Sequence, residues 1–174
     1  EVLQKGITAP SYRMSNLKAP KKVEPQELKP TEMADLITQI VEIEGPIHFD
    51  EIARRVASIF DKSRAGKRIQ ESVKAGLKNI QRTTQSLIVE EDFWMTRSQK
   101  ETVPVRDRSE AEGPIAKSDN LSSLEILAAG KLIRKESGSM ELPEMVKAVA
   151  KLLGFSRVVG DLKSRLQKVL SQLY

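Results

Sequence analysis

Residues 44–82 read EGPIHFDEIARRVASIFDKSRAGKRIQESVKAGLKNIQR, and this stretch decides the fold. The alternation of apolar side chains in 47–49 predicts a short strand, and Asp50 is a suitable N-cap for a helix over 51–60. After a tight turn, apolar residues recur three and four positions apart, which predicts a second helix over 65–81. The stretch is therefore expected to fold as strand, helix, turn and helix.

The same pattern returns 93 residues further along the chain, without a gap. Core positions that keep their apolar character while surface positions differ are typical of a duplicated fold. We therefore predict two copies of one module. The matching positions are Ile40, Ile47, Ile52, Val56, Ile69, Val73 and Leu77 in the first copy and Ile133, Met140, Met145, Val149, Leu162, Leu166 and Leu170 in the second.

The repeat divides the 174 residues into two small domains. Residues 1–30 contain four prolines and little apolar periodicity, which predicts an extended arm or interdomain tether. The first module is expected over 31–96 and the second over 121–174. The polar segment 97–120 between them reads as a linker.

Two strand candidates follow the second helix of the first copy, at 86–89 and 93–95, and Glu90, Glu91 and Asp92 separate them. This spacing predicts a β-hairpin with an acidic tip. The order helix, strand, helix, turn, helix, hairpin is that of a winged helix. We therefore expect a mainly α fold with a short β-hairpin (α+β), built from tandem winged-helix-like repeats of which the second lacks its wing.

Positive charge is concentrated on the second helix of the first copy. Residues 62–82 hold seven basic side chains and one acid, Glu71, for a net charge of +6, while the whole chain carries +5. In a helix-turn-helix this helix enters the major groove and basic side chains contact phosphates; the alternative is an ordinary solvated polar face. The candidate nucleic-acid-binding residues are Ser63, Arg64, Lys67, Arg68, Lys74, Lys78 and Arg82, with Arg157 and Lys163 as weaker candidates in the second copy.

The residues offer no catalytic or metal-binding pattern. The chain has no cysteine and one histidine, His48, which excludes a disulfide, a Cys-based zinc site, a His pair and a catalytic triad. We expect His48 to make a structural hydrogen bond near the strand, and the acidic tip to be an exposed turn. The chain is predicted to be no enzyme by itself and to need no cofactor or metal.

The absence of an apolar run of roughly 20 residues argues against a membrane helix. We therefore expect a cytoplasmic protein. The chain starts at Glu1, and its second copy stops at Tyr174, earlier than the first copy does. Both features favour a piece of a larger protein.

Four stretches together resemble a bacterial domain family of unknown function: VEIEGPIH (41–48), DKSRAGKRIQESV (61–73), VPVRDRS (103–109) and KLLGFSR (151–157). The family looks like the C-terminal region of large proteins that join a superfamily-one helicase-type ATPase to a restriction-endonuclease-like nuclease. The resemblance covers roughly residues 31–174. It implies an ATP-dependent parent that processes nucleic acid, and it supplies no catalytic residue for this chain.

The leading interpretation is a non-catalytic accessory module that binds DNA, with duplex and non-specific binding expected, for a helicase- or nuclease-like parent. Its partners would be DNA and the rest of the parent polypeptide, with no membrane and no small-molecule substrate. The alternative is a protein-interaction scaffold. The two are distinguished by whether Arg64, Lys67 and Lys74 lie free on one face or pair with acids such as Glu42, Glu44 or Glu51.

Overall fold

The computed structural model describes residues 6–174, and the first five residues of the expected arm lie outside the described part. The chain divides into two compact units. The first unit is Arg13–Thr102, and the second is Val103–Tyr174 together with the N-terminal segment that ends at Tyr12.

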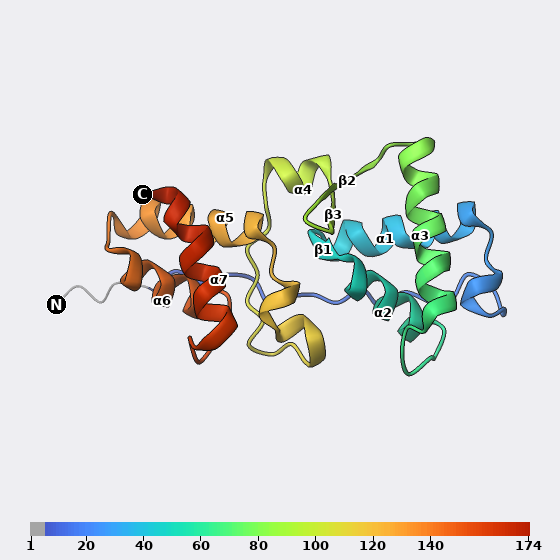
Figure 1. Cartoon of the computed structure of the whole chain (residues 1–174), viewed down its shortest axis with the longest axis horizontal. Helices are drawn as coiled ribbons and strands as arrows, with labels where there is room; N and C mark the ends of the chain where they lie inside the picture. Colours follow the sequence, from blue (N-terminus) through green and yellow to red (C-terminus); the bar gives the residue numbers. More distant parts are fainter. Residues whose placement is uncertain (1–5) are drawn as a thin grey trace. The chain divides into compact units, whose positions relative to one another are not determined.

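The first unit combines helices with one small sheet, so the expected α+β class is confirmed (Figure 1). The sheet is antiparallel with the order β1-β3-β2, in which Ile47 pairs with Trp94 and Val89 pairs with Trp94 from the other side. The predicted hairpin is formed by β2 and β3. The elements are η1 (Pro25–Glu27), α1 (Pro30–Glu44), β1 (Ile47–His48), α2 (Phe49–Ile59), α3 (Lys67–Arg82), β2 (Leu87–Glu90), β3 (Phe93–Thr96) and α4 (Arg97–Glu101).

Two helix starts differ from the sequence prediction. Helix α1 begins at Pro30, ahead of the predicted cap Thr31, because the fixed φ of proline suits the first helical position. Helix α2 begins at Phe49, and its N-cap is His48, whose Nδ1 accepts a hydrogen bond from the backbone N–H of Asp50 at 3.1 Å. The structural hydrogen bond expected of His48 is therefore present, and it serves the cap that was assigned to Asp50.

The core of the first unit lies between α1, α2 and α3. Ile37, Ile52 and Val73 are fully buried there. Helix α3 crosses α1 closely (Figure 1), and Gly76 makes the approach possible, since a Cβ at this position would lie 2.7 Å from Cγ of Met33. Any larger residue at position 76 would push the two helices apart.

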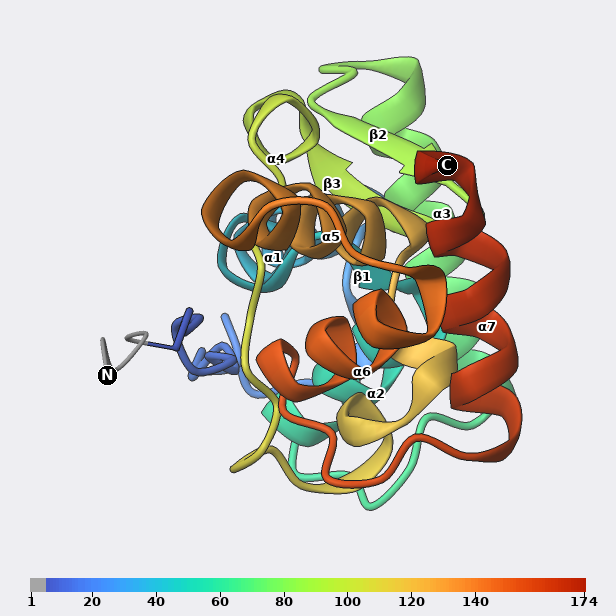
Figure 2. The same cartoon turned by 90° about the vertical axis from the view of Figure 1, so that its left-hand side faces the viewer.

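The second unit is helical, and α5, α6 and α7 pack against one another (Figure 2). The strand predicted at 140–142 is absent from the described residues, because Leu142 already belongs to a helix. The last helix begins at Gly160, and the residue before it, Val159, is extended. The elements are η2 (Gly113–Ala116), η3 (Ser118–Asn120), α5 (Ser123–Ser137), α6 (Leu142–Leu152), α7 (Gly160–Leu170) and η4 (Ser171–Leu173).

The helix boundaries of the two units follow the 93-residue offset. Helices α1, α2 and α3 begin at Pro30, Phe49 and Lys67, and α5, α6 and α7 begin 93 residues later in each case. Core positions also correspond, since Val73 and its counterpart Leu166 are both fully buried. The match is weaker at the start of the third helix, where Ile69 is buried and its counterpart Leu162 is half-buried.

The segment expected to be a linker contains ordered and buried structure. It holds α4, η2 and η3, and residues 103–120 belong to the second unit. Arg106 and Arg108 are buried in it because both guanidinium groups contact the buried carboxylate of Glu125. The polar composition that suggested a linker therefore serves an internal ion cluster.

None of the helices in the described part of the chain is long and apolar enough to span a membrane.

Candidate nucleic-acid interface

Helix α3 presents two distinct faces. Its apolar residues Ile69, Val73, Leu77 and Ile80 are buried against the rest of the first unit. Positions that lie four, three, four and four residues apart fall on one line along the opposite face of a helix. In α3 that line, which we call the α3 stripe, consists of Lys67, Glu71, Lys74, Lys78 and Arg82, and all five are exposed.

The remaining candidates lie where α3 begins. Ser63 and Arg64 are exposed in the preceding turn, and Arg68 is exposed in the first helical turn. Gly66 is the N-cap residue and supplies no side-chain cap. An open depression of about 420 Å³ lies here, lined by Ser63, Arg64, Lys67 and Arg68 and also by Glu24. The helix start is thus a recessed and mostly basic surface.

The basic side chains of this region are almost free of acidic partners. Lys62 pairs with Glu24, with Nζ and Oε2 2.6 Å apart. In the described part of the chain no ion pair involves the six other basic residues between 64 and 82. Lys74 lies over the ring of Phe49, with Nζ 5.6 Å from the ring centroid, which leaves its charge exposed to solvent. The α3 stripe therefore keeps its positive charge.

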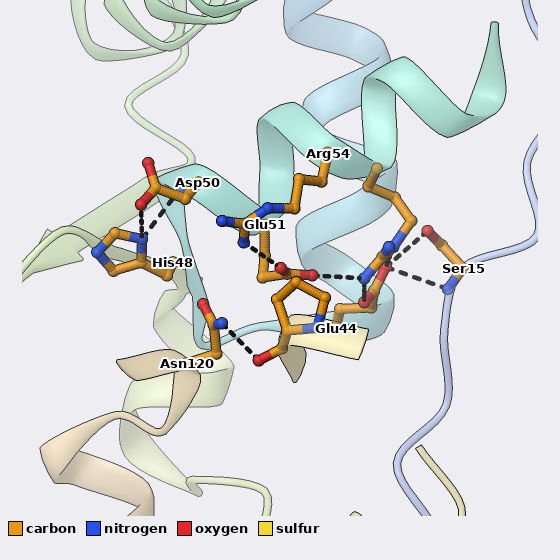
Figure 3. A network of polar contacts seen from close by, with 9 residues as sticks. Ser15, Glu44, His48, Asp50, Glu51, Arg54 and Asn120 are labelled. Carbon is orange, nitrogen blue, oxygen red and sulfur yellow. Dashed lines mark hydrogen bonds and ion pairs between the residues drawn. The ribbon is translucent and has the colours of Figure 1, made fainter. Parts of the chain in front are cut away.

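Two acids that could have neutralised α3, Glu44 and Glu51, pair with arginines of α2 instead (Figure 3). Arg55 donates to both carboxylate oxygens of Glu44, at 2.6 and 2.7 Å, and contacts Glu51 at 3.3 Å. Glu51 also pairs with Arg54, and Ser15 donates from its hydroxyl to Glu44 at 2.7 Å. These residues, which we call the Glu44 cluster, connect α1 and α2 with the stretch around Ser15, which precedes η1 in the first unit.

Burial by itself raises the pKa of Glu44, because it removes water from the carboxylate. The hydrogen bonds and the charge of Arg55, with the hydrogen bonds from Ser15, outweigh burial and hold the pKa of Glu44 below its usual value. Glu44 is therefore ionised at neutral pH, and its charge is compensated within the cluster.

The tip of the hairpin formed by β2 and β3 carries acidic residues. Glu91 and Asp92 have φ values of 51° and 65°, as a tight two-residue turn between β2 and β3 requires. Both are exposed, and Glu90 pairs with Lys100 of α4 at 2.6 Å. A tip with this charge repels phosphate, so binding through the hairpin is disfavoured.

Phe93 and Trp94 are successive residues of β3, so their side chains point to opposite faces of the sheet. Both are buried, at 3% and 8% exposure. Phe93 meets His48 edge to face, with ring centroids 5.1 Å apart, and Trp94 belongs to the core of the first unit.

The candidates of the second unit lie in a different setting. Arg157 and Lys163 are both exposed, and Asp161 occupies the first turn of α7 between them. The positions that match the α3 stripe are Gly160, Ser164, Gln167 and Ser171, and none of these is charged. Arg165 is half-buried and donates to the carbonyl of Leu121 at 2.7 Å. The structure therefore does not gather the basic residues of α7 into a stripe.

The sequence reading missed a buried cluster in the second unit. Glu125 is fully buried, and its carboxylate meets Arg106 at 2.6 Å and Arg108 at 2.5 Å. Both guanidinium groups lie over the ring of Tyr12, at 4.7 and 5.1 Å. The alternating arginines of VPVRDRS were the available signal, since residues two apart in an extended segment point to the same side.

The Glu125 cluster shifts two pKa values. Burial works against ionisation of both groups, raising the pKa of Glu125 and lowering that of Arg108. The mutual charge and hydrogen bonds prevail, so the pKa of Glu125 lies below its usual value and that of Arg108 above it. Glu125 also lies in the first turn of α5, where its backbone N–H donates to Oγ of the N-cap residue Ser122 at 3.1 Å.

No group of three or more acidic or histidine side chains that could hold a metal ion occurs among the described residues.

Comparison with known proteins places one part of the chain. Residues 27–71, from η1 into α3, match a family described as "Protein of unknown function (DUF3320)". This match includes Glu44, Glu51, Arg54 and Arg55 of the Glu44 cluster, but not Ser15, and it includes the start of α3. No curated protein and no solved structure matches the chain.

Proposed function

We propose that the first unit is a winged-helix module that binds duplex DNA without sequence preference through α3. In this proposal the chain is a non-catalytic accessory part of a helicase- or nuclease-like DNA-processing protein. Its partners are the DNA and the remainder of the parent polypeptide.

The topology supports the winged-helix assignment. The order α1, β1, α2, α3, β2, β3 and the sheet order β1-β3-β2 are those of a helix-turn-helix followed by a β-wing. In such a fold α3 is the helix that enters the major groove. The acidic hairpin tip leaves α3 as the element that meets the phosphates.

The charge of α3 is the observation that carries the proposal. Six exposed basic side chains between Arg64 and Arg82 have no acidic partner in the described part of the chain, and four of them follow the α3 stripe. The uncapped start of α3 adds backbone N–H groups that favour an anion. The stripe offers no Asn or Gln for reading adenine, and three of its four basic residues are lysines, which contact phosphate as flexible point charges.

The test is a titration of the full chain with duplex DNA at several salt concentrations. Four phosphate contacts predict a log–log salt slope of about −3.6, at roughly −0.9 for each phosphate. The dissociation constant should be on the order of 10⁻⁴ to 10⁻⁶ M at physiological salt. The double change Lys67→Glu and Lys74→Glu should remove most of the binding and flatten the slope.

Lys163→Glu in the second unit is the matched control, and it should matter less because α7 lacks the stripe. Circular dichroism should show that the double variant stays folded, since Lys67 and Lys74 are exposed. Undetectable binding at 50 mM salt, or a double variant that binds like the wild type, would refute the proposal.

A scaffold role remains the second candidate, and an observation in the second unit favours it there. The face of α7 that matches the α3 stripe is neutral, so it offers little to a phosphate backbone. A neutral and partly polar helix face suits a protein partner better. The second unit would then hold a protein while the first holds DNA.

A further inference from the structure

A cavity of about 420 Å³ opens in the second unit between α5, α6 and the N-terminal segment. Its size falls within the range of small-ligand pockets, roughly 300–1,000 Å³. Apolar side chains form most of its wall, and three polar residues, Glu136, Ser137 and Lys151, complete it. The apolar residues of the wall are Ile7, Ile133, Met140, Ala148 and Leu152.

The internal repeat explains why this space is open. At the 93-residue offset, Ser137 takes the place of Glu44 and Ala148 takes the place of Arg55. In the first unit those two large side chains form a buried ion pair. In the second unit Ser137 is exposed and Ala148 is half-buried, so the volume of the missing pair is not refilled.

We propose that this cavity binds an arginine side chain of a partner protein. The same place in the first unit already holds one, that of Arg55. The apolar wall suits the aliphatic stem of arginine, while the polar residues suit its guanidinium group. The proposal concerns a protein partner and does not depend on DNA binding by α3.

Glu136 is the acid of the cavity wall that can pair with the guanidinium group, and it takes part in no ion pair within the described residues. Lys151 also lines the cavity and opposes a cation, so it limits the affinity.

The experiment uses the full chain and three capped tripeptides, acetyl-Ala-Arg-Ala-amide and the same peptide with Lys or Leu in the middle. Methyl NMR signals of Ile133, Met140 and Leu152 report the cavity, and Ile52 in the first unit is the reference. The arginine peptide should shift the cavity signals alone. The lysine peptide should bind about two- to fivefold more weakly, because it lacks the planar fork of donors.

Three variants of the cavity wall test whether it binds arginine. Glu136→Gln should weaken arginine binding about two- to fivefold, and Lys151→Gln should strengthen it by a similar factor. Ala148→Arg should fill the cavity from within and abolish the shifts, with DNA binding through α3 unchanged. If Ala148→Arg does not fold, the Glu136 and Lys151 variants decide.

Three results would overturn the proposal: no shift with the arginine peptide, leucine-peptide binding at least as tight, or no response to Glu136→Gln. Tight leucine binding would instead identify an apolar pocket.

Discussion

Helices α3 and α7 occupy the same place in their units, yet they present different surfaces. Helix α7 begins 93 residues after α3, just as α5 and α6 begin 93 residues after α1 and α2. Val73 of α3 and its counterpart Leu166 of α7 are both buried. The exposed line of α3 carries four basic residues, whereas the matching line of α7 carries none. The two units therefore share the spacing of their helices and core residues, while the exposed faces of their third helices differ in charge.

The buried polar groups diverged in the same way. The first unit joins α1 and α2 through Glu44 and Arg55, and the second has Ser137 and Ala148 at these positions. The second unit instead ties its preceding segment to α5 through Arg106, Arg108 and Glu125. Breaking a buried ion pair by removing one partner is costly, so each of these contacts should matter to the stability of its own unit.

The largest expected effect comes from removing the buried acids. Glu125→Ala removes the one carboxylate that both buried arginines contact and should lower the free energy of unfolding of the second unit by about 3–5 kcal/mol. Glu44→Ala should cost the first unit less, because Arg55 keeps its contact with Glu51. Urea denaturation can follow the units separately, since the only tryptophan, Trp94, lies in the first unit and both tyrosines, Tyr12 and Tyr174, lie in the second.

Glu42→Ala and Glu112→Ala are the matched controls for these two variants, because both side chains are exposed. They should change stability little. Equal losses from Glu44→Ala and Glu125→Ala would show that the remaining contact between Arg55 and Glu51 does not compensate for the loss of Glu44.

Acid should lower the stability of both units, because it protonates Glu44 in the first unit and Glu125 in the second. The pKa values of Glu44 and Glu125 are lowered in the folded state, so their contribution to stability is present above the unfolded value of 4.5 and is lost as the pH falls below it. Thermal unfolding followed between pH 7 and pH 3 should show this loss, and Glu44→Gln and Glu125→Gln should each flatten the profile of their own unit. A profile that these variants leave unchanged would assign the acid sensitivity to other groups.

The smallest expected effect is a gain of binding by the second unit. In the Lys67→Glu and Lys74→Glu background, Gln167→Lys and Ser171→Lys would place two lysines on the α7 line that matches the α3 stripe. If the stripe alone separates the helices, DNA binding should partly return, with a salt slope of about −1.8 for two phosphates.

Ser139→Lys and Gln172→Lys add the same charge to the second unit at exposed positions off that line. They should restore less binding. Equal rescue by both pairs would show that net charge, and not its arrangement on the helix, governs binding.

Local pattern predicted the helices of the first unit and the hairpin well. Periodicity and flanking prolines and glycines depend on neighbours along the chain, so α1, α3 and the β2–β3 pair could be placed to within a few residues. The errors fell where two local signals competed. His48 took the capping role expected of Asp50, and Leu142 started a helix where alternation suggested a strand.

The residues of the candidate interface could be predicted from the sequence, but their ion pairing could not. The sequence shows seven basic side chains around one helix, yet it does not show which are paired. Only the fold places Glu24 beside Lys62 and Glu44 beside Arg55, because these contacts join residues of different elements. The contact between Glu51 and Arg55 is local, since the two residues lie four apart on α2.

The sequence by itself determined the α+β class, the 93-residue spacing of apolar positions and the concentration of charge on α3, because each of these follows from residue spacing. The tertiary structure alone decided that residues 103–120 belong to the second unit and that Arg106 and Arg108 turn inward. It also decided that an open cavity replaces the Glu44–Arg55 pair. The physical reason is that burial of a charge depends on a partner brought near by folding, which no local pattern encodes.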